Sequence, residues 1–136
     1  MTAIDPTPDH PMPDHPTPDH PTPNHPMPVA PVAVAPTPVD LAAAAAALPD
    51  AWSSRLLGHV GSAAVKVLRM DGQPLAIEHH PTAEALLVLD GRLELVVDGA
   101  ETTVGPGGLA WVPAGARHAV RPGSHGTLVI VEVPEG

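Results

Sequence analysis

The chain has 136 residues, which is the size of one ordinary domain, and a formal net charge of −9. It contains no cysteine, so disulfide bonds are excluded and any metal site must use histidine and carboxylate ligands. The six basic residues all lie after residue 50 and are scattered, so we expect no nucleic-acid partner and no membrane partner. We find no stretch of secretory-signal or membrane-spanning type, and we therefore expect a cytoplasmic protein.

Residues 1–39 form a segment of their own, in which proline occupies almost every second or third position. A pentapeptide, first seen at residues 7–11 as TPDHP, repeats along this segment and carries His10, His15, His20 and His25. Proline cannot donate a hydrogen bond to a helix or sheet, and the other residues offer little to bury, so we expect a disordered, polyproline-II-rich tail. Five residues advance roughly 15 Å along a polyproline II helix, so the imidazoles of successive repeats lie too far apart for a tight metal site. This favours a solvated spacer, and weak metal binding is the alternative.

Residues 40–136 have the composition of one folded domain, and a short helix is predicted at its start, over residues 40–48. Asp40 suits the N-cap position, because its carboxylate can accept a hydrogen bond from a free backbone amide. The alanines that follow have the highest helix propensity, and Pro49 sets the end of the helix.

From Ser62 onward the pattern changes to short β-branched and aliphatic segments separated by turn residues. Asp-Gly pairs at residues 71–72, 90–91 and 98–99 lie between these segments and predict tight hairpin turns. Many short strands at this spacing are typical of an all-β sandwich or barrel. We expect strands at residues 64–69, 75–80, 85–89, 92–97, 101–104, 109–112 and 127–133.

Four side chains with metal-ligating chemistry stand out in two separate segments. The first segment reads EHHPTAE from Glu78 to Glu84, and the second reads PAGARH and ends at His118. Glu78 and His80 are two apart on a predicted strand and share a face, while His79 points to the opposite face. Glu84 begins the next predicted strand, and His118 follows a Pro-Gly corner far along the chain. A barrel can bring these four side chains together, and no local structure can.

With Gly91 and Gly107 at the expected distances, the two segments resemble the paired motifs of small single-domain cupins of the type-2 conserved-barrel family. The resemblance covers about residues 55–134, and the spacing matches at every motif position. Two residues differ, because Glu78 stands where the family has its first histidine and Pro122 stands where it has an asparagine. The resemblance implies an all-β fold, the cupin double-stranded β-helix or jelly-roll barrel, with one short N-terminal helix before it.

By the same resemblance, Glu78, His80, Glu84 and His118 are the expected ligands of one divalent metal ion. Two carboxylates with two imidazoles suit Mn, Fe, Zn or Ni, and selectivity for a soft metal is not expected. The alternative is a cupin that has lost its metal.

The resemblance further implies a metal-dependent enzyme that acts on a small oxygen-rich or anionic molecule, and it assigns no residue to catalysis. Because the barrel supports many functions, a non-catalytic small-molecule binding or sensing cupin stays open, as does a metal-free cupin with an interaction role. We expect a pocket of aliphatic side chains without aromatic stacking partners or recognition arginines, and we expect a homodimer.

Overall fold

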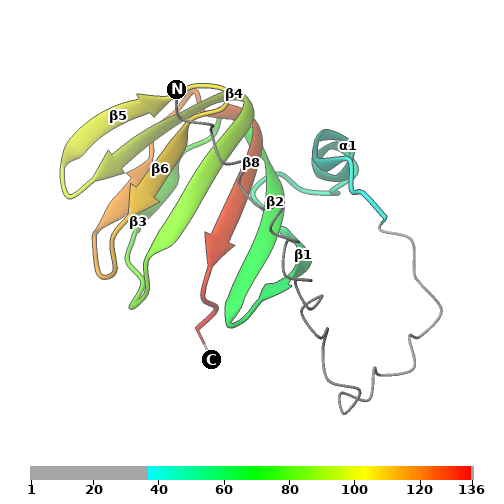
Figure 1. The fold of residues 1–136 in the computed structure, drawn as a ribbon. Coiled ribbons are helices and arrows are strands. Elements are labelled where there is room, and N and C mark those ends of the chain that lie inside the picture. The colour runs from blue at the N-terminus through cyan, green and yellow to red at the C-terminus, as the bar shows by residue number, and fades with distance from the viewer. Residues whose placement is uncertain (1–36, 136) are drawn as a thin grey trace, which may run out of the picture. The chain divides into compact units, whose positions relative to one another are not determined.

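The structure, a computed structural model, describes residues 37–135, so nearly all of the tail predicted over residues 1–39 lies outside the described residues. The described residues are mostly β-strand, which confirms the all-β prediction (Figure 1). Among them, no helix has the length and hydropathy needed to cross a bilayer. The elements are α1 (Leu41–Ala46), β1 (Arg55–Val60), β2 (Ala63–Asp71), β3 (Leu75–Glu78), β4 (Glu84–Val97), β5 (Ala100–Val104), β6 (Leu109–Val112), β7 (His118–Val120) and β8 (His125–Glu132).

The strands form one antiparallel sheet that curls around its own inner face (Figure 1). Its order is β1-β2-β8-β4-β7-β3, and β5 and β6 also pair with β4. The long strand β4 joins the two halves of the barrel, because its first part pairs with β6 and β8 and its last part pairs with β5 and β7. The curl therefore places the starts of β4 and β7, which are distant in sequence, on one inner face.

The Asp-Gly pair at residues 90–91 does not form the predicted hairpin turn, because β4 runs through it without interruption. The register against β8 shifts at this point, so the pair is a β-bulge that bends the strand. Gly91 has a φ of 73°, and a Cβ atom there would collide with the carbonyl oxygen of His125. The pair Asp98-Gly99 does form a hairpin turn, between β4 and β5, with φ values of 47° and 80°.

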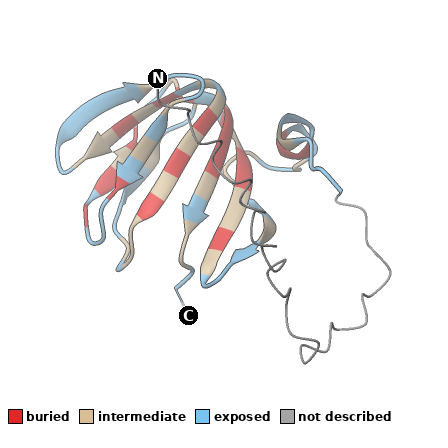
Figure 2. Cartoon of the chain, viewed as in Figure 1, coloured by how far each residue is buried: buried red, intermediate tan, exposed pale blue. Residues whose placement is uncertain are grey.

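Two groups of apolar side chains hold the domain together, one on each face of the curled sheet. In Figure 2, buried residues alternate with more exposed ones along β2 and β4, as a half-buried strand requires. The smaller group joins Ala44 and Ala45 of α1 to Val67 and Val129 on the outer face. The larger group fills the barrel and includes Leu68, Met70, Leu86, Val88, Leu93, Leu95, Val112, Ala116, Val120 and Leu128.

The predicted helix is confirmed, and hydrogen bonds secure both of its ends. Asp40 is the N-cap, and its Oδ1 accepts a hydrogen bond from the backbone amide of Ala43 at 3.0 Å. At the other end, the guanidinium of Arg69 donates to the carbonyl oxygens of Ala45, at 2.8 Å, and Leu48, at 3.0 Å. A cation at this position also complements the negative end of the helix dipole.

Candidate metal centre

Three of the four predicted ligand residues lie where strands of the barrel begin or end, and the fourth lies in a connection between two strands. Glu78 is the last residue of β3, and His80 lies two residues beyond it. Glu84 and His118 are the first residues of β4 and β7. Because β3 and β7 pair antiparallel with Glu78 opposite His118, the two motifs meet across the ladder. The amide of Gly115 donates to the carbonyl oxygen of His80 at 2.7 Å, which ties the second motif to the first.

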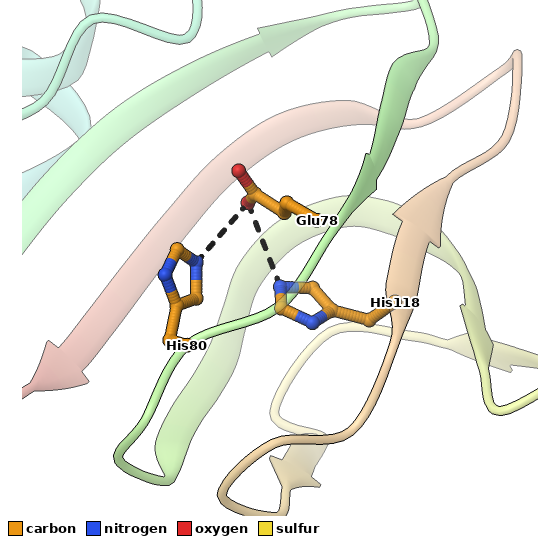
Figure 3. A group of neighbouring side chains, drawn as sticks. All are labelled: Glu78, His80 and His118. Atoms are coloured by element: carbon orange, nitrogen blue, oxygen red, sulfur yellow. Dashed lines mark ion pairs between the residues drawn. The ribbon is translucent and has the colours of Figure 1, made fainter.

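Three of the four side chains form a close group, and the fourth contacts it through His118. One ligand atom each from Glu78, His80 and His118 lies within 4.8 Å of the others. Figure 3 shows the Glu78 carboxylate between the two imidazoles, with its Oε1 at 3.5 Å from the Nε2 of each. The Oε1 of Glu84 lies 3.1 Å from the Nε2 of His118. His79, which follows the end of β3, is exposed as predicted, but Glu78 is exposed as well, so burial does not alternate here.

The imidazole of His118 is held in an orientation that suits metal ligation. Its ring is buried, and its Nδ1 lies 3.1 Å from the carbonyl oxygen of Ala116. A carbonyl can only accept, so Nδ1 carries the proton and the Nε2 of the neutral ring carries a lone pair. Within the described residues this Nε2 has no hydrogen-bond partner, although carboxylate oxygens of Glu78 and Glu84 lie near it. A lone pair facing two carboxylates is unfavourable unless a proton or a cation lies between them, so the donor set fits a divalent metal ion.

The charges around the site shift the pKa values of its side chains. Burial lowers the pKa of His80, but the hydrogen bond with Glu135 and the negative charges of Glu78 and Glu84 outweigh it, so the pKa of His80 is raised. Burial raises the pKa of the Glu84 carboxyl, and a hydrogen bond with Glu132 raises it further, against the opposing effect of the imidazoles. Both His80 and Glu84 therefore hold a proton more readily than the free side chains do.

Lys66 and Glu132 lie beside the predicted ligands, and the sequence analysis missed both. Burial raises the pKa of Glu132, but the hydrogen bond from Lys66 outweighs it and the pKa of Glu132 is lowered. The Nζ of Lys66 lies 2.8 Å from the Oε1 of Glu132. Lys66 lies on β2 and Glu132 on β8, in strands that are otherwise largely apolar. A charged residue inside such a strand was the signal that could have identified them.

The candidate site opens into a cavity of about 290 Å³ inside the barrel. Side chains of Leu68, Leu93 and Leu95 line this cavity together with all four predicted ligand residues. Trp52 lines it as well, so the prediction of a pocket without an aromatic side chain was wrong. Trp52 lies between α1 and β1, outside the predicted strands, where no pattern in the sequence placed it near the site.

Comparisons with known proteins agree with this fold. A family model described as "Cupin domain" matches residues 68–134, a stretch that contains all four predicted ligand residues. Quercetin 2,3-dioxygenase from Bacillus subtilis (strain 168) is 41% identical over 66 residues, which are 48% of this chain and 19% of the dioxygenase. The alignment with this chain thus spans about a fifth of the dioxygenase.

The fold of this chain is similar to those of solved structures with low sequence identity. A protein of Neisseria meningitidis, NMB1881, is 20% identical with a TM-score of 0.62, over 72% of this chain and 100% of that one. A cupin-2 domain containing protein from Shewanella frigidimarina NCIMB 400 is 20% identical with a TM-score of 0.59, over 64% of this chain and 85% of that one. At this level of identity the likeness concerns the fold alone, and it confirms the predicted jelly-roll barrel.

Proposed function

We propose that this chain, which belongs to the cupin family, binds one divalent metal ion and acts as a metal-dependent enzyme on a small molecule held in its barrel. The proposed ligands are Glu78, His80, Glu84 and His118. The observation that carries the proposal is the buried Nε2 of His118, which faces two carboxylates without a hydrogen bond. Two imidazole nitrogens and two carboxylates suit Mn, Fe, Zn and Ni alike.

Two observations support an enzyme rather than a structural role. The stretch similar to a quercetin 2,3-dioxygenase covers about half of this chain, and the proposed ligands line a cavity that can hold a small molecule. A bound metal ion would supply a Lewis acid for an oxygen atom of the substrate. The aliphatic side chains of Leu93 and Leu95 make the inner wall of the cavity apolar, which strengthens electrostatic interactions close to them.

Metal analysis of two matched histidine variants tests the ligand set. We expect wild-type protein, purified without an affinity tag and dialysed against Zn²⁺ or Mn²⁺, to retain about one ion per chain. His118→Ala should lose the ion, because it removes a proposed ligand that the Ala116 carbonyl holds in place. His79→Ala should retain it, because His79 is exposed and is not a proposed ligand. Glu78→Gln keeps the shape of an exposed side chain, so it should weaken metal binding without loss of folded structure in circular dichroism.

The ligand set is wrong by one residue if His79→Ala loses the ion and Glu78→Gln keeps it. If folded wild-type protein takes up none of these metals at neutral pH, both the metal site and the enzyme function are wrong. The division of the chain after residue 39, the cytoplasmic location and the homodimer stay predictions from the sequence.

A further inference from the structure

Most of the side chains that line the cavity beside the proposed metal ligands are apolar. Eight aliphatic residues line it, and three of them are almost completely buried, with exposures of 0% for Leu93, 1% for Leu95 and 3% for Leu128. The polar residues that line it are the four proposed ligands together with Ser54 and Glu132. Away from these polar residues, the hydroxyl groups of a sugar or polyol would lie against aliphatic side chains that cannot form hydrogen bonds with them, which is costly.

The charges around the cavity also disfavour a phosphorylated ligand. None of the described residues that line the cavity is a lysine or arginine. Lys66 lines a second cavity that shares His80, Glu84 and Glu132 with the first, but its ammonium group is already paired with Glu132 at 2.8 Å. A volume of about 290 Å³ lies at the small end of the range for ligand pockets. The cavity therefore suits a small molecule with little charge.

Trp52 supplies the aromatic wall of this cavity, and the fold holds it in a specific orientation. Its backbone has a φ of 65°, which is rare for a bulky residue and persists only where the surroundings impose it. Its amide donates to the carbonyl oxygen of Arg69 at 2.8 Å, and its indole Nε1 donates to the Oδ1 of Asp71 at 2.8 Å. With the polar edge of the ring satisfied by Asp71, the rest of the indole packs against the apolar interior of the barrel.

We propose that the barrel binds a small molecule with an apolar body and a single oxygen-bearing head, and that Trp52 is the specificity-determining residue that packs on this body. The inference rests on the proposed function only for the position of the head, which the metal ion would hold. The apolar body depends on the cavity walls and on Trp52 alone, so the two parts can be tested separately.

The two tryptophans of the chain provide a direct test. Trp111→Phe leaves Trp52 as the sole indole fluorophore, whereas Trp52→Phe leaves Trp111, which is 64% exposed and does not line the cavity, as the matched control. The ligands to titrate are 1-hexanol, hexanoate and gluconate. Hexanoate and gluconate are both six-carbon carboxylates, and they differ only in the hydroxyl groups of the body. Each titration uses EDTA-treated protein and Zn²⁺-loaded protein, because Zn²⁺ has no redox chemistry.

We expect 1-hexanol to shift the emission of the Trp111→Phe variant with and without Zn²⁺, and to leave the emission of the Trp52→Phe variant unchanged. Hexanoate should bind the Zn²⁺-loaded Trp111→Phe variant at least about tenfold more tightly than gluconate, which corresponds to the burial of roughly two methylene groups. Trp52→Ala should weaken the binding of hexanoate to Zn²⁺-loaded protein, measured by calorimetry, while the bound Zn²⁺ per chain stays the same.

Three results would overturn the inference: no response of Trp52 to 1-hexanol, gluconate binding as tight as hexanoate binding, or unchanged hexanoate binding in Trp52→Ala. Failure of the proposed function would give a different result. The protein would then take up no metal, but 1-hexanol would still shift the emission of Trp52. The 1-hexanol result thus tests the apolar cavity whatever the metal content.

Discussion

Gly91→Ala tests the bulge at which β4 passes from one half of the barrel to the other. The φ of Gly91 is 73°, a left-handed conformation that residues with a Cβ atom rarely adopt. An added Cβ would collide with the carbonyl oxygen of His125 on β8, and it would lie 2.6 Å from the carbonyl carbon of His125 and 2.9 Å from the Cα of Gly126. These are backbone atoms of a paired strand, so relief of the collision requires β8 to move.

Gly99→Ala is the matched control for the conformational part of the cost. Gly99 has a similar φ of 80°, but no atom lies within 4 Å of the position its Cβ would take. The left-handed conformation costs about 1–2 kcal/mol at either position. At Gly91 the displacement of β8 adds about 1–3 kcal/mol, the usual cost of overpacking. We therefore expect Gly91→Ala to lower the free energy of unfolding by about 2–5 kcal/mol, out of a total of about 5–15 kcal/mol for a domain.

Urea unfolding of the two variants and the wild type, followed by circular dichroism, measures this difference. Gly91→Ala should lose at least about 1 kcal/mol more than Gly99→Ala, which is the smallest cost expected from the displaced strand. Equal losses would refute the reasoning, because they would mean that β8 does not press against Gly91 and that residues 90–91 form an ordinary turn.

Two further predictions concern the metal site and the helix. Zn²⁺ binds the neutral imidazole, and the pKa of His80 is raised above its ordinary value of 6.5. The proton uptake at His80 that competes with Zn²⁺ should therefore have its midpoint at a pH above 6.5, which a Zn²⁺ affinity measured against a chelator across the pH range reports. A Zn²⁺ affinity that stays constant down to that pH would contradict the raised pKa. Arg69→Met removes the hydrogen bonds to the carbonyl oxygens at the end of α1. It should therefore lower the free energy of unfolding, measured in urea, by about 1–3 kcal/mol. The control is Arg55→Met on the exposed edge strand β1, which should change this free energy little. An equal effect of both substitutions would show that the hydrogen bonds from Arg69 to α1 do not contribute to the free energy of unfolding.

Local patterns in the sequence predicted the all-β fold class, and the resemblance to the cupin motifs identified the candidate ligand residues. The resemblance to the cupin motifs predicted that Glu78 and His80 share a site, although the strand expected over residues 75–80 ends at Glu78 and its alternation does not extend to His80. Asp40 and the alanines after it likewise predicted α1, because capping and helix propensity act over a few neighbouring residues. The order of the two motifs then indicated the barrel that brings His118 to them.

The tertiary structure alone decided which strand an ambiguous segment pairs with and which side chains face the cavity. Asp90-Gly91 and Asp98-Gly99 have the same preference for positive φ, but pairing with β8 makes the first pair a bulge and leaves the second a turn. The sequence placed His118 in a strand but did not predict the bounds of β7, because this three-residue strand is defined by its partners β3 and β4. Trp52 reaches the cavity through hydrogen bonds to residues 69 and 71, contacts between segments that only the folded chain brings together.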